Sequence, residues 1–113
     1  MAKDDYHVIV YQILAYLYVQ LKAGEKVDAK LLEADSNYLN INKIYWTYII
    51  ENLHNQGLVS GVVINKAWGG DISLIDIKDI MITPKGIEYL TDNSFLNKAK
   101  EFLKDIRAIV PFI

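Results

Sequence analysis

The spacing of apolar residues changes at Gly57, and this change constrains the fold more than any other feature of the sequence. Before Gly57, apolar side chains recur at intervals of three or four residues, a pattern typical of helices that bury one face. After Gly57, β-branched and apolar residues form short runs interrupted by glycines, which is typical of strands joined by a turn. The sequence therefore predicts a mainly helical α+β fold in which strands follow a group of helices.

Three helices are predicted in the N-terminal half. The first runs from about Asp5 to Ala23 and ends at Gly24, which can adopt the left-handed conformation that closes a helix. A short helix from Asp28 to Ala34 starts at an aspartate that can cap it. The third helix runs from about Asn42 to Gln56 and is stopped by Gly57. Its residues at the spacing expected for burial are Trp46, Ile49, Ile50 and Leu53.

The first helix is apolar on two sides. One side carries Tyr6, Val10, Ile13, Leu14, Leu17 and Leu21, and the other carries Val8, Ile9, Tyr16 and Val19. The second side therefore needs a cover, which is either another part of the chain or a second subunit. Packing within the chain is the simpler interpretation.

A long β-hairpin is predicted after Gly57. Its first strand spans Leu58 to Ile64, with Gly61 as a bulge, and its second strand spans Ile72 to Thr83. The turn between them, Asn65 to Asp71, combines flexible glycines with one large aromatic residue.

Two further helices are expected after the hairpin. Pro84 cannot extend a strand but suits the first turn of a helix, so Thr83 is expected to cap a short helix that reaches Leu90. A last helix is predicted from about Phe95 to Val110, where apolar and charged residues occupy opposite faces. Its apolar stripe packs within the chain in the simpler interpretation and on another subunit in the alternative.

This order of elements is that of a winged helix-turn-helix: three helices, a β-hairpin wing and a short helix, here with an extra amphipathic C-terminal helix. A chain of 113 residues, 52% of them hydrophobic, can bury one core but not two. We therefore expect a single domain over residues 1–113, with its core over about 5–92 and the C-terminal helix over about 95–110.

The same segments are similar to those of a known family. The residues that carry the similarity are Tyr45-Trp46 with Leu53, Gly57-Leu58-Val59, and the segment from Ile82 to Leu90 followed by Asn93-Ser94. Over nearly the whole chain they resemble the YjcQ-like family of small bacterial and prophage-encoded proteins. The resemblance implies a winged-helix fold, and it implies no established biochemical activity.

The composition excludes several classes of protein. There is no cysteine, so disulfide scaffolds, thiolate metal sites and cysteine nucleophiles are absent. The charged N-terminus and the lack of a long apolar run predict neither a secretory signal nor a membrane span, so a cytoplasmic protein is expected. The net charge of −2 and a single arginine, Arg107, argue against tight base-specific recognition of nucleic acid.

The residues needed for catalysis are few and badly spaced. His7 and His54 lie on different predicted helices and neither forms a His-Glu-x-x-His pair, so they are expected to be surface or packing residues. Gly69-Gly70 lacks the rest of a dinucleotide or phosphate loop. Asp71, Asp76 and Asp79 do not match a calcium loop. We therefore expect no enzyme activity, cofactor, metal or small-molecule substrate.

Binding of double-stranded DNA is the first functional hypothesis, with the third helix in the major groove and the wing on the backbone. A prophage-related transcriptional regulator would be of this kind. The residues expected to contact DNA are Asn40, Asn42, Lys43, Thr47 and Lys66. Helix capping is the competing and more economical explanation for Asn40 and Asn42. Glu51 on the same helix argues against the hypothesis because a carboxylate repels phosphate.

A protein-interaction module on the same scaffold, either a homodimer or a phage-related adaptor, is the alternative. Apolar residues expected on the outside of the third helix favour it, as does a tryptophan on the wing. The residues expected at such an interface are Ile44, Tyr48, Trp68, Phe102, Ile106 and Ile109. The two hypotheses differ in electrostatics, because DNA binding requires lysines gathered on the side of the third helix and wing.

Overall fold

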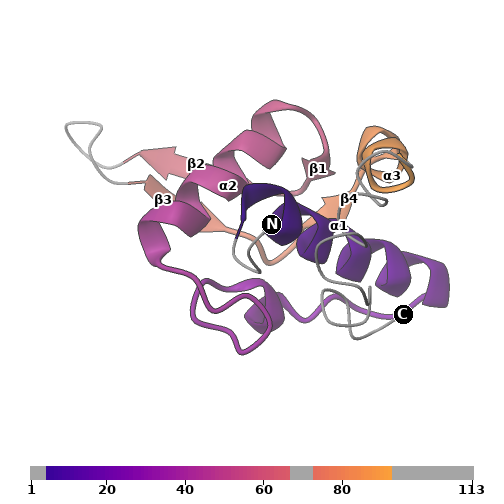
Figure 1. The fold of residues 1–113 in the computed structure, drawn as a ribbon, viewed down its shortest axis with the longest axis horizontal. Coiled ribbons are helices and arrows are strands. Elements are labelled where there is room, and N and C mark those ends of the chain that lie inside the picture. The colour runs from indigo at the N-terminus through magenta and orange to yellow at the C-terminus, as the bar shows by residue number, and fades with distance from the viewer. Residues whose placement is uncertain (1–4, 67–72, 93–113) are drawn as a thin grey trace.

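Three α-helices, one short 3-10 helix and two antiparallel strand pairs make up the described part of the chain (Figure 1). The structure is a computed structural model, and it describes residues 5–66 and 73–92. In chain order the elements are α1 (Tyr6–Ala23), η1 (Ala29–Leu32), α2 (Lys43–Asn55), β1 (Val59–Ser60), β2 (Val63–Lys66), β3 (Ser73–Asp76), β4 (Met81–Ile82) and α3 (Pro84–Leu90). The predicted α+β class is confirmed.

Helix α1 lies at the centre of the fold. Every residue from Val8 to Leu17 is buried, and the helix contacts α2, α3 and β4. The second apolar side of α1 is covered within the chain at Val8, Ile9 and Tyr16, as the simpler interpretation predicts. The helix ends as predicted, because Gly24 adopts a left-handed φ of 69°.

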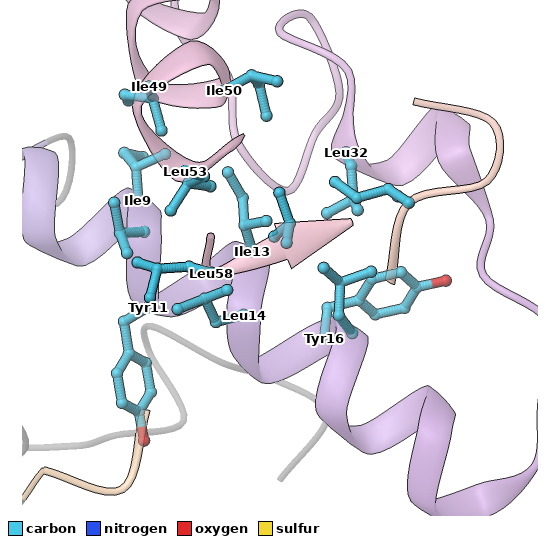
Figure 2. Close-up of a cluster of buried hydrophobic side chains, with 14 of the residues drawn as sticks. Ile9, Tyr11, Ile13, Leu14, Tyr16, Leu32, Ile49, Ile50, Leu53 and Leu58 are labelled. Carbon is cyan, nitrogen blue, oxygen red and sulfur yellow. The ribbon is translucent and has the colours of Figure 1, made fainter. Parts of the chain in front are cut away.

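The core lies between α1 and α2. Figure 2 shows side chains of α2 directed toward those of α1, with Leu58 between them and Leu32 at one side of the cluster. The labelled residues from α2 are Ile49, Ile50 and Leu53, and all three are fully buried. The apolar spacing in the sequence therefore identified the buried face of α2 correctly.

The short helix predicted from Asp28 to Ala34 is instead the 3-10 helix η1. Asp28 caps it as expected, with Oδ1 accepting a hydrogen bond from the backbone N–H of Lys30 at 3.1 Å. The element ends early because Glu33 adopts an extended backbone, and the carbonyl of Leu32 accepts a buried hydrogen bond at 2.7 Å from the indole of Trp46. That bond fixes η1 against α2.

The predicted hairpin is present, but each of its strands is divided in two. β1 pairs with β4 through Val59↔Ile82 and Ser60↔Met81, and β2 pairs with β3 from Val63↔Asp76 to Lys66↔Ser73. Gly61, with φ 75°, separates β1 from β2.

On the other strand, a turn separates β3 from β4. The N–H of Ile80 donates to the carbonyl of Ile77 at 3.1 Å, and the N–H of Lys78 donates to Oδ1 of Asp76 at 2.9 Å. The physical reason for this break is that Ile77 and Ile80 are both buried. They are three residues apart, so in a continuous strand their side chains would point to opposite faces and only one of them could reach the core. The predicted turn Asn65–Asp71 is also too long at its start, because Asn65 and Lys66 belong to β2.

Helix α3 begins as the sequence predicts. Pro84 is its first residue, and Thr83 caps it by accepting a hydrogen bond from the N–H of Gly86 at 3.1 Å. The helix packs against α1 and β4. Within the described residues, no helix is both long and apolar enough to cross a membrane.

The predicted helix over about 95–110 lies outside the described residues, and so do Trp68, Phe102, Ile106 and Ile109. The roles predicted for these residues stay predictions.

Candidate nucleic-acid interface

Asn42 is the N-cap of α2. Its Oδ1 accepts a hydrogen bond from the backbone N–H of Tyr45 at 2.8 Å. A bidentate contact with adenine needs both the oxygen and the nitrogen of an asparagine amide. The cap fixes the orientation of this oxygen toward the backbone of α2 and away from a free bidentate contact, and the capping explanation is confirmed for this residue.

Asn40 does not cap α2. It has a left-handed backbone with φ 48°, a conformation that asparagine tolerates better than most residues, and its N–H donates to the carbonyl of Ser36 at 2.8 Å. Its side chain is exposed, and the residue lies two positions before the N-cap Asn42. The capping explanation therefore fails for Asn40, whose exposed amide can offer both an oxygen and a nitrogen to a base.

Lys43 is held in place at the first turn of α2. Its Nζ lies 4.1 Å from the centroid of the Trp46 ring, a cation–π arrangement, while the residue as a whole stays exposed. It borders an open pocket of about 480 Å³ that is also lined by Glu33, Ala34, Asp35 and Ile41. Two carboxylates near the predicted phosphate contact reduce the local positive potential.

The outer face of α2 carries two large exposed side chains. Ile44 is 84% exposed and Tyr48 is 59% exposed, whereas Thr47 and Glu51 are half-buried. The expectation that Ile44 and Tyr48 lie on the outside of this helix is confirmed. Their contact with a partner stays a prediction.

Tyr48 also belongs to a line of aromatic rings that joins the three helices. Its ring makes an edge contact with Tyr6 of α1, with centroids 6.1 Å apart, and Tyr6 makes a similar contact with His7 at 5.3 Å. The Nδ1 of His7 lies 2.9 Å from the hydroxyl of Tyr89 on α3. These contacts restrain Tyr48, so less of its ring is free for a partner than its position on α2 suggests.

The β2–β3 ribbon projects beyond the helices (Figure 1). One face carries the exposed residues Val63, Asn65, Leu74 and Asp76, and the other places Ile64 and Ile75 against the core. Leu74 is 65% exposed. Lys66 is exposed near the end of the ribbon and pairs with Ser73.

The charges on these elements are nearly balanced. Lys43 and Lys66 are the lysines of α2 and the β2–β3 ribbon, and Glu51 and Asp76 are their carboxylates. The described residues of these elements therefore carry no excess of lysines over carboxylates.

In residues 5–66 and 73–92, no group of three histidine or acidic side chains is close enough to hold a metal ion. His7 and His54 are exposed, as expected for surface residues. Asp76 and Asp79 are exposed, and Asp71 lies outside the described residues.

Sequence reasoning missed two features of this surface. The Lys43–Trp46 contact has a local signal, because residues three apart on a helix are neighbours. The ring contact between Tyr6 and Tyr48 has no such signal, since it depends on how α1 and α2 pack.

Comparison with known proteins agrees with the resemblance drawn from the sequence. The sequence model described as YjcQ protein matches residues 11–109, which is most of the chain. Neither the curated proteins nor the solved structures gave a match. The protein is a member of the YjcQ family.

Proposed function

We propose that the protein binds double-stranded DNA as a winged-helix protein, with α2 in the major groove and the β2–β3 ribbon against the backbone. The observation that carries the proposal is the arrangement of the elements. α2 follows α1 and η1, exposes side chains of its first two turns and is succeeded by a projecting antiparallel ribbon. A winged helix uses the same arrangement to read DNA.

The described residues divide into two roles. Lys43 and Lys66 contact one phosphate each, and Asn40 and Thr47 reach base edges. Asn42 positions the start of α2 through its cap, and its amide N–H groups can donate to DNA. Binding at a defined site would make the protein a transcriptional regulator, of a prophage in the case suggested by its family resemblance.

Two phosphate contacts predict weak binding with a modest dependence on salt. Each neutralised phosphate contributes about −0.9 to the slope of log K against log salt, so two contacts give about −1.8 and a loss of about tenfold between about 50 mM and about 200 mM salt. Fluorescence anisotropy of a labelled mixed-sequence duplex measures this loss.

Variants assign the contacts. Lys43→Gln and Lys66→Gln are each expected to make the slope of log K against log salt shallower by about 0.9. Lys22→Gln is the matched control because Lys22 lies in the last turn of α1, away from α2, and its slope should equal that of the unaltered protein. The absence of binding at about 100 μM protein in low salt lies below ordinary non-specific affinity and overturns the proposal.

A protein-interaction role is the second candidate, with a second copy of the chain as the partner. It is favoured by the exposed apolar side chains on the same elements, which are Ile44, Tyr48, Val63 and Leu74. Analytical ultracentrifugation tests this role. It is supported if the protein is a dimer, if Ile44→Asp dissociates the dimer and if the control Met81→Asp leaves the dimer intact. A monomer at all concentrations contradicts it.

A further inference from the structure

We propose that Ile44 is a specificity-determining residue that reads thymine, through contact between its side chain and the C5-methyl group in the major groove. This inference rests on the DNA binding proposed above. It names the base-pair type that the surface prefers, which the proposal of DNA binding leaves open.

The first argument is the exposure of Ile44. It is the second residue of α2 and is 84% exposed, the largest value among the exposed hydrophobic residues of the described chain. Residues at the start of a recognition helix are the ones that reach base edges. The major-groove edge of a base pair offers one apolar group, the thymine methyl, so an isoleucine placed there gains most from thymine.

The second argument is the restraint on its neighbours. The ammonium group of Lys43 is held over Trp46, and the ring of Tyr48 packs against Tyr6. Thr47 is half-buried. Ile44 is therefore more exposed than Tyr48 and Thr47, and it does not share the ring contacts that restrain Lys43 and Tyr48.

The third argument is the polar partner nearby in sequence. The exposed amide of Asn40 can accept from and donate to adenine, and the base opposite adenine is thymine. Asn40 and Ile44 flank the start of α2 and supply the two chemistries that an A·T pair presents.

The test compares two duplexes that differ only in the methyl group. One is an alternating adenine–thymine duplex, and in the other uracil replaces every thymine. Removal of one buried methyl is worth about 0.8 kcal/mol, so the protein is expected to bind the thymine duplex about fourfold more tightly. Measurement is by anisotropy in low salt.

Protein variants separate the contact from any effect of uracil on DNA stiffness. Ile44→Ser removes the apolar side chain and should bind both duplexes equally, whereas Ile44→Leu should keep the preference. Met81→Ala is the control, since Met81 is an exposed apolar residue on β4 and its loss should leave the fourfold ratio unchanged. Circular dichroism confirms that the variants are folded.

The outcomes distinguish this inference from the proposal beneath it. Salt-sensitive binding that is equal for the two duplexes overturns the role of Ile44 and leaves DNA binding intact. A preference that survives Ile44→Ser also overturns it, because another residue must then read the methyl. No binding to either duplex overturns both.

Discussion

Gly61 allows two parts of the long hairpin to approach closely. Its φ of 75° is unfavourable for residues with a side chain, and a Cβ at this position would collide with the carbonyl oxygen of Asp79. Gly57 has nearly the same φ, 73°, but open space where a Cβ would lie. Substitutions at Gly57 and Gly61 can therefore distinguish the cost of backbone strain alone from the cost of strain together with a steric collision.

We expect Gly57→Ala to lower the free energy of unfolding by about 1 kcal/mol, the cost of the left-handed conformation alone. Gly61→Ala should lower it by clearly more, about 3 kcal/mol, because the backbone must also shift. Urea denaturation of both variants measures the difference. Equal losses would show that the turn containing Asp79 shifts without cost.

Capping at the residue scale was only partly predictable. Asn42 was expected to cap a helix, and it does, because the residue before a helical pattern is the usual position for a cap. Asn40 has the same side chain and lies two residues away, yet it adopts a left-handed turn instead. Which asparagine caps is decided by where α2 starts, and helix ends are the least certain part of a prediction from sequence.

At the scale of elements, Thr83 connects the start of α3 to the end of α2. Its Oγ1 accepts from the N–H of Gly86 at 3.1 Å and donates to the carbonyl of Gly57 at 2.6 Å. One hydroxyl therefore caps α3 and also holds the chain segment that leaves α2.

We expect Thr83→Ala to lower the free energy of unfolding by about 2 kcal/mol, because it removes a helix cap and a second hydrogen bond. Thr83→Ser keeps the hydroxyl and should cost less than about half as much. Thermal or urea unfolding compares the two variants. A Thr83→Ser variant as unstable as Thr83→Ala would mean that the methyl group, and not the hydroxyl, matters.

The elements with strong local signals were predicted well. α1, α2 and α3 each have a periodic apolar face and a recognisable start or stop residue, and their ends fall within about two residues of the prediction. The division of the hairpin was not predicted in full. Gly61 gave a warning of the first break, but the turn from Ile77 to Ile80 depends on both isoleucines reaching the core, which local sequence does not reveal.

At the scale of the whole molecule, tyrosine hydroxyls join segments that are distant in the chain. Tyr38 donates to the backbone carbonyl of Gln12 at 2.8 Å, and Tyr16 accepts from the backbone N–H of Asp28 at 2.8 Å. His7 and Tyr89 are 82 residues apart in sequence and meet at 2.9 Å. Such contacts depend on tertiary packing, and apolar spacing alone predicts burial of the rings but not the partners of the hydroxyls.

These tyrosines predict a loss of stability in alkali. Burial raises the pKa of Tyr38, and nearby Tyr11 and Tyr16 raise it further. Burial, with Tyr6 and Asp92, raises the pKa of Tyr89 to about 12. Because the unfolded chain releases these protons near pH 10 and the folded chain does not, the stability they contribute is complete below about pH 10 and is lost as the pH rises toward 12.

The measurement is the urea midpoint at about pH 9 and about pH 11. The urea midpoint should be lower at the higher pH than at the lower pH. This decrease should be smaller in Tyr38→Phe than in the unaltered protein. Tyr38→Phe should also be less stable at the lower pH, because it loses the hydrogen bond to Gln12. If the urea midpoint decreases by the same amount in Tyr38→Phe as in the unaltered protein, ionisable groups other than Tyr38 cause the loss of stability in alkali.

The central position of α1 has a consequence for synthesis of the chain. α1 is complete at Ala23, but two of the elements that it contacts, β4 and α3, begin only at Met81 and Pro84. At about 5–20 residues per second, the ribosome needs roughly 3–12 s to reach them. α1 is thus made well before β4 and α3, and the apolar residues that it packs against them are not covered by these elements during that interval.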